Sequence, residues 1–206
     1  MNRIYVWGLV VAALIALLLS IAGQRGMLGE RPAPQAQKEG VALIGGPFAL
    51  VDGAGATITE RDFAGRHMLV SFGFTSCPDV CPTLLITVGQ TLDALGDDAA
   101  APQALFITVD PARDTPDVVA AYVKNFHPDL VGLSGSVEQV AAAAATYRIY
   151  YAKVPNPDAA AGDTDDYTID HSAYLYLMGP DGTYLTHFTH RTTVEEIVAV
   201  IRGELG

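Results

Sequence analysis

Cys77 and Cys81 are the only two cysteines among the 206 residues of the chain. They belong to the segment CPDVCP, which is separated by two residues from the apolar run at 67–74 and ends at Pro82. The run is typical of a buried strand, and a proline is typical of the first turn of a helix. If Cys77 lies just before the helix and Cys81 in its opening turn, both sulfurs lie on one side. They can then share a metal ion or form a disulfide.

The position of the pair favours thiol chemistry. The amino end of a helix carries a partial positive charge and free N–H groups, which favour the thiolate that metal binding and redox exchange both need. The residues alone leave three possibilities: a metal site, a redox-active disulfide and a structural disulfide. Structural disulfides more often tie separate elements together, and thioredoxin chemistry usually has two residues between the cysteines rather than three.

Alternating strand and helix patterns predict the scaffold of this segment. Strands are expected at 67–74, 104–109, 130–133 and 149–154, and helices at 82–96, 117–126, 137–146 and 194–205. Hairpins are expected at 41–51 with 56–59 and at 173–178 with 183–188, whereas 155–166 reads as an acidic loop. This order predicts an α/β, thioredoxin-like three-layer domain with a mixed central sheet and an N-terminal β-hairpin.

The N-terminal residues have a different composition. Residues 4–22 form an uncharged run without proline after Arg3, which is long enough to cross a bilayer as one transmembrane helix. We therefore predict a membrane anchor at 1–23. A cleaved signal peptide is the alternative, because the run ends in SIA, but the run is longer than a usual signal core. Residues 24–40 predict a flexible linker, and 41–206 form the domain.

The charge of the chain excludes one class of partner. It has 12 basic and 23 acidic residues and a formal net charge of -11. Nucleic-acid-binding proteins are usually basic on the binding face. We therefore expect no nucleic acid partner.

Four separate blocks, in order, resemble one protein family. They are 72–82 (FGFTSCPDVCP), 109–116 (VDPARDTP), 166–172 (DYTIDHS) and 179–182 (GPDG). The chain is similar over about 41–205 to the Sco/SenC family of membrane-anchored, thioredoxin-like copper proteins. At position 76 this chain has serine where the family often has histidine, and the acidic loop has no clear counterpart.

The resemblance implies a function. It implies a copper metallochaperone that helps to assemble the binuclear copper centre of cytochrome c oxidase subunit II. It places the copper ligands, for Cu(I) or Cu(II), on Cys77, Cys81 and His171. The single span and the cysteine chemistry predict a single-pass protein of the inner membrane with its domain on the periplasmic side. A further periplasmic copper chaperone or a thiol reductant is expected as an additional partner.

The residues around the predicted ligands fit this reading. Two thiolates and an imidazole suit copper, whereas a structural zinc site usually has four protein ligands. His171 is expected just before a strand that faces the cysteine loop, with Asp170 orienting its ring or balancing charge as a neighbour of the ligands. Asp79 is expected either to cap the helix or to help the metal to reach the site.

Two other functions remain open from the sequence. An exported thiol-disulfide oxidoreductase would use Cys77 and Cys81 as its redox pair and reduce the cysteines of the same target, leaving His171 without a role. A copper-responsive sensor would bind the same metal. A metallochaperone does not need to turn over a substrate, so we expect no enzymatic activity beyond thiol-disulfide exchange.

Overall fold

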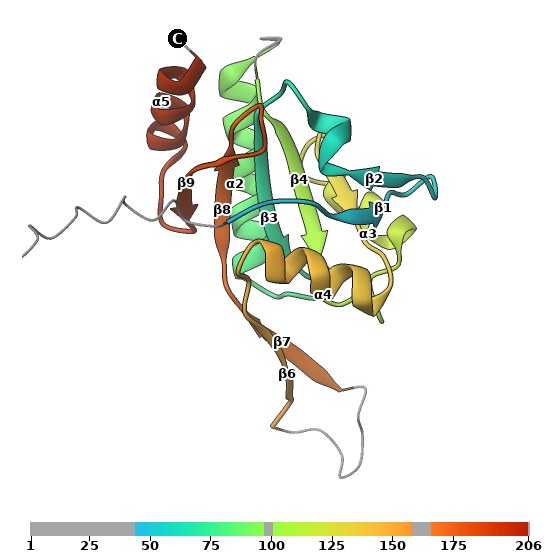
Figure 1. Cartoon of the computed structure of the whole chain (residues 1–206). Coiled ribbons are helices and arrows are strands. Elements are labelled where there is room, and N and C mark those ends of the chain that lie inside the picture. The colour runs from blue at the N-terminus through green and yellow to red at the C-terminus, as the bar shows by residue number, and fades with distance from the viewer. Residues whose placement is uncertain (1–43, 97–100, 158–165, 206) are drawn as a thin grey trace, which may run out of the picture. The chain divides into compact units, whose positions relative to one another are not determined.

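A computed structural model describes residues 44–96, 101–157 and 166–205 (Figure 1). The predicted anchor, the predicted linker and most of the acidic loop lie outside these ranges. Within them, no helix is both long enough and apolar enough to cross a membrane.

The centre of the domain is a five-stranded mixed sheet in the order β5-β4-β3-β8-β9. Strand β3 (Met68–Gly73) is buried along its whole length, as its apolar sequence predicts. It pairs in parallel with β4 (Gln103–Thr108) and antiparallel with β8 (Tyr174–Met178). The outer strands are β5 (Val131–Leu133) and β9 (Tyr184–Thr189). The predicted mixed sheet is confirmed.

Helices cover both faces of this sheet (Figure 1). They are α2 (Val80–Leu95), α3 (Pro116–Val123), α4 (Val137–Thr146) and α5 (Val194–Leu205). Alternate residues of β3 belong to different hydrophobic clusters: Val70 and Phe72 pack with α4, whereas Leu69 packs with α2, α3 and α5. Since successive side chains of a strand point to opposite faces, the two clusters fill the two sides of the sheet.

The predicted N-terminal hairpin is present but shorter than expected. Strand β1 (Ala49–Val51) pairs antiparallel with β2 (Thr57–Thr59), and a short 3-10 helix, η1 (Glu60–Phe63), follows. The Asp52 carboxylate accepts hydrogen bonds from the backbone N–H groups of Ala54 and Ala56 and so closes the turn. Residues 44–48, which were predicted to extend the first strand, form no strand.

Two helix starts show how local sequence sets the boundaries. Ser136 caps α4, and Gln139 completes a reciprocal capping box. Helix α2 begins at Val80, two residues before the predicted start, with Pro82 as its third residue. A proline is tolerated there because the first N–H groups of a helix have no partner within it.

Strand β7 (Tyr167–His171) was not predicted. It pairs with β6 (Tyr151–Pro155), which was expected at 149–154, in a two-stranded sheet of their own. We call these two strands the β6–β7 ribbon; Figure 1 shows it projecting away from the main sheet. The expectation that His171 lies just before a strand is therefore incomplete, because His171 is also the last residue of β7.

Candidate metal centre

The three predicted ligands come together at one end of β3. Cys77 lies in the loop after β3, Cys81 in the first turn of α2, and His171 at the end of β7. Their Sγ, Sγ and ring nitrogen atoms all lie within 4.8 Å of one another. The Cys81 Sγ to His171 Nε2 distance is 3.4 Å, and both cysteines are free thiols. Residues separated by 90 positions thus form one cluster.

The imidazole of His171 is held by two contacts. Its edge faces the ring of Phe74, with the ring centroids 5.7 Å apart, and its Nδ1 lies 3.0 Å from the carbonyl oxygen of Ser172. With Nδ1 donating to this carbonyl, Nε2 is left facing Cys81 with a free lone pair. This is the tautomer that a metal ligand needs.

The contacts change the roles predicted for the two acidic neighbours. Asp170 is exposed, and the carbonyl of Ser172 rather than Asp170 orients the ring of His171. Asp79 occupies the N-cap position of α2 but its side chain makes no capping hydrogen bond. Its ψ of -71° lies outside the extended region in which a side chain can reach back to the helix. The prediction that Asp79 caps α2 through its side chain is therefore wrong.

Asp114 holds the loop that carries Cys77. Its carboxylate accepts hydrogen bonds from the backbone N–H of Thr75 at 2.9 Å, the Thr75 hydroxyl and the Thr108 hydroxyl. Asp114 is 1% exposed, and a buried carboxylate needs such donors. The same loop also contains a local salt bridge, between Arg113 and Asp110. The contact of Asp114 with the cysteine loop was not predicted from the sequence.

Gly73 leaves room for the Cys81 sulfur. A Cβ at position 73 would lie 2.7 Å from Cys81 Sγ and 2.8 Å from the ring of Phe106. Gly73→Ala is therefore expected to destabilise the protein by about 1–3 kcal/mol and to lower copper affinity. Chemical denaturation and copper competition would measure the two effects. The matched control is Gly203→Ala, because a Cβ at position 203 would meet no other atom. Gly55→Ala is unsuitable, because the φ of +81° at Gly55 would strain an alanine. Unchanged copper affinity in Gly73→Ala would contradict the close packing.

The two thiols differ in acidity. A hydrogen bond from the Cys81 side chain, helped by His171 and by backbone N–H groups, lowers the pKa of Cys77 from 9.0 to about 4 despite burial. The backbone N–H of Cys81 also points at Cys77 Sγ, at 3.4 Å. The same pairing and the burial of the side chain raise the pKa of Cys81. At neutral pH the pair therefore shares one proton, with the charge on Cys77.

Alkylation would test this asymmetry. Because the pKa of Cys77 is lowered to about 4, its thiolate persists as the pH falls from 8 to about 5 and is lost only near pH 4. The charged form stabilises the reduced fold above the unfolded pKa of Cys77, and this stability is lost as the pH falls through the folded pKa. Iodoacetamide labelling followed by mass spectrometry is expected to modify Cys77 first, at a rate nearly constant over pH 5–8.

The matched control is Cys81→Ala, which removes the hydrogen-bond donor. Labelling of Cys77 in this variant is expected to fall off at a higher pH than in the unaltered protein. A profile of the unaltered protein centred near pH 9 would contradict the assignment of the charge to Cys77.

The cluster fits a soft metal ion. Donor-metal distances of about 2.0 Å for nitrogen and 2.3 Å for sulfur need donors about 4.6 Å apart or less, so a small adjustment of the side chains is enough. Two thiolates and an imidazole are a soft donor set that suits copper. The cluster found among the described residues has three members, one fewer than a structural zinc site usually has.

Comparison with known proteins agrees with this geometry. Residues 36–206 match the family model described as SCO1/SenC. The chain is 40% identical over 188 residues to the human "Protein SCO1 homolog, mitochondrial", a match that covers 88% of this chain and 60% of the human protein. The chain thus spans less than two thirds of that relative's length.

Solved structures share the fold. The copper-bound ScoI of Arabidopsis thaliana superimposes with a TM-score of 0.72 at 37% identity, covering 79% of this chain and 98% of that one. The copper-bound ScoI of Bradyrhizobium japonicum gives 0.70 at 43% identity, covering 78% and 98%. The thioredoxin-like α/β fold of these proteins is the fold described above. Since the family model covers most of the sequence, including all three members of the cluster, the chain belongs to the SCO1/SenC family.

Proposed function

We propose that this protein is a copper metallochaperone that helps to assemble the binuclear copper centre of cytochrome c oxidase subunit II. The observation that carries the proposal is the convergence of Cys77, Cys81 and His171, with all three donor atoms within 4.8 Å. Copper is the cargo, and the three side chains are its ligands. Related proteins of the same fold have been solved with copper bound.

The geometry supports transfer by ligand exchange. Cys77 is 9% exposed and Cys81 is 3% exposed, so an incoming thiolate of the partner reaches the Cys77 side of the cluster first. The partner's thiolates replace Cys77 and then Cys81, while His171 holds the ion on the other side. Exchange with a disulfide of a partner protein oxidises Cys77 and Cys81 to a disulfide and reduces the partner's disulfide to two thiols, which removes both thiolates and empties the site.

The location of the protein follows the same proposal. Residues 1–23 would anchor it in the inner membrane and residues 24–40 would link the anchor to the domain at 41–206, on the periplasmic side. A membrane-bound chaperone is then held beside its membrane-embedded target. A second copper carrier or a thiol reductant would load or reset the site, with Asp79 and Asp170 exposed near it as contacts for these partners.

Cells that lack the protein would test the proposed role. Subunit II isolated from them is expected to be deficient in copper, and added copper is expected to restore part of the metal content. Re-expression of the unaltered chain should restore it fully, and re-expression of the Cys81→Ser variant should not. Normal copper content in subunit II from the deletion strain would contradict the proposal.

A second candidate is a thiol-disulfide oxidoreductase that reduces the cysteines of the same target. The unequal acidity of the pair favours it, because a low pKa at Cys77 makes a nucleophilic thiolate at neutral pH. This function needs Cys77 and Cys81 and gives His171 no direct part in the chemistry. The His171→Ala variant therefore separates the two candidates.

A further inference from the structure

The position of His171 depends on what holds the β6–β7 ribbon. The ribbon pairs with no strand of the main sheet, and a two-stranded ribbon alone is marginally stable in water. The cysteines are fixed by β3 and α2, which belong to the core. The third ligand is on a separate element, so its geometry requires a tie between ribbon and core.

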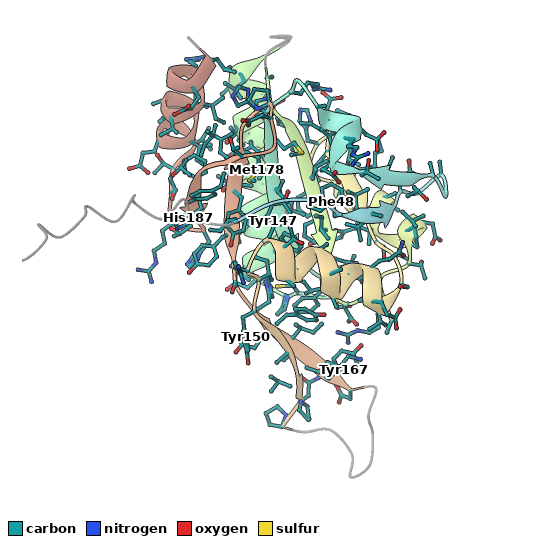
Figure 2. The ribbon with its side chains drawn as sticks, in the orientation of Figure 1. Phe48, Tyr147, Tyr150, Tyr167, Met178 and His187 are labelled. Atoms are coloured by element: carbon teal, nitrogen blue, oxygen red, sulfur yellow. The ribbon has the colours of Figure 1, made fainter. Side chains whose placement is uncertain are left out.

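Tyr167 provides such a tie. It is 8% exposed and lies far out on the ribbon, whereas Tyr150 marks the ribbon's base (Figure 2). Its hydroxyl donates to the buried carboxylate of Asp110 at 2.8 Å. Arg113 donates through Nη1 to the Tyr167 carbonyl oxygen at 2.9 Å, and its guanidinium lies 3.9 Å from the centre of the tyrosine ring.

The core side of this tie is itself fixed. Asp110 is 1% exposed and forms a salt bridge with Arg113, in the loop that follows β4. The neighbouring Asp114 holds Thr75 in the cysteine loop. One short loop thus contacts both the segment that carries Cys77 and the strand that carries His171.

One hydrogen-bond donor of Arg113 is left unpaired in this arrangement. Its Nη2 is buried without a hydrogen-bond partner among the described residues, and a buried unpaired donor is destabilising. Lys153, on the ribbon itself, also lies over the Tyr167 ring, at 4.0 Å. Lys153 can support the ring but cannot join it to the core. Only Arg113 and Asp110 do so among these contacts.

We propose that Tyr167, held by Asp110 and Arg113, is a positioning residue that fixes His171 against the two cysteines. This inference deepens the proposed copper function and depends on it for its main readout. Tyr167 and His171 are four residues apart on one strand, about 13 Å along it. Anchoring β7 at Tyr167 limits the movement of its other end. The imidazole of His171 therefore keeps its position beside the cysteines before copper binds. Groups that contact a metal ligand directly typically change metal affinity by about 10–100-fold, so a tie that acts through the strand is expected at the low end of this range.

The test compares two substitutions of Tyr167 in two backgrounds. Tyr167→Leu removes the ring and the hydroxyl, and Tyr167→Phe removes only the hydroxyl. Copper affinity of the reduced full chain is measured by competition with a chelator. Tyr167→Leu is expected to lose about tenfold in affinity, and Tyr167→Phe less. In a His171→Ala background, both substitutions are expected to have no further effect, because the ligand they position is gone.

The matched control is Tyr184→Phe, which removes a hydroxyl bonded to His187 on β9 and should leave affinity unchanged in either background. Equal losses from Tyr167→Leu with and without His171 would show a general structural role and overturn the inference, as would no loss in either.

A second readout separates this inference from the proposed function. Amide hydrogen exchange in β7 is expected to be faster in Tyr167→Leu than in the unaltered chain, whether or not copper binds. If the unaltered chain binds no copper, the proposed function fails. Hydrogen exchange in β7 then still tests whether Tyr167 holds the ribbon to the core. Unchanged exchange in Tyr167→Leu would overturn this inference.

Discussion

Replacing Cys81 by serine is expected to abolish tight copper binding while leaving the fold intact. Cys81 is the most buried donor, at 3% exposure, and its sulfur lies 3.4 Å from His171 Nε2. A hydroxyl is a hard ligand that copper binds poorly. The serine hydroxyl can still donate a hydrogen bond to Cys77, as the Cys81 thiol does, so the loss of affinity comes from the missing sulfur ligand. The expected loss exceeds the roughly 100-fold that an outer contact costs.

Chelator competition with the reduced protein would measure this loss, and circular dichroism would verify the fold. Ser76→Ala is the matched control, because Ser76 is exposed in the same loop and provides no ligand. Cys81→Ser can neither bind copper tightly nor form a disulfide with Cys77. This variant therefore identifies the site but does not separate copper delivery from thiol exchange. Copper affinity close to that of Ser76→Ala would show that Cys81 is not a ligand.

Replacing His171 by alanine is expected to separate the two candidate functions. The imidazole is one of three donors, and its Nε2 faces the sulfur of Cys81. Its loss should reduce copper affinity by about 100-fold or more, because a ligand contributes more than an outer contact does. The cysteine pair remains, so reduction of a model disulfide should continue at a similar rate. His171 contributes only a secondary part of the lowered pKa of Cys77.

Two assays on the same variant give the answer. Copper transfer to the isolated copper domain of subunit II, followed by the appearance of the binuclear-centre spectrum, is expected to fail in His171→Ala. Thiol exchange is expected to persist. His187→Ala is the control, since His187 is exposed on β9 and lies outside the cluster. Full copper transfer by His171→Ala would show that delivery does not need His171 and would contradict the three-ligand site.

The sequence predicted the elements that form through local patterns. The apolar run of β3 and the hairpin turn between β1 and β2 both depend on neighbouring residues, and each appears as expected. The two cysteines could be placed on one side of the helix start, because their spacing of four residues corresponds to about one helix turn. The place of His171 beside them came from the family resemblance, and the structure brings it to 3.4 Å from Cys81.

The missed features depend on contacts between distant segments. Strand β7 pairs with β6 across a long acidic loop, so neither strand predicts the other. Its one local signal was the alternation of Tyr167, Thr168 and Ile169, in which the first and third are buried. The contacts of Asp114 with Thr75, and of Asp110 with Tyr167, span 39 and 57 residues. No local pattern predicts such pairs, although buried aspartates after a strand are a sign that partners exist.

Anaerobic titration of the reduced protein with Cu(I) tests the central claim most directly. A site made of Cys77, Cys81 and His171 is expected to bind about one copper per chain, with release of protons from the thiol pair. X-ray absorption of the complex should show two sulfur neighbours and one nitrogen neighbour. Binding of much less than one copper per chain, or a metal environment unchanged in His171→Ala, would contradict the account.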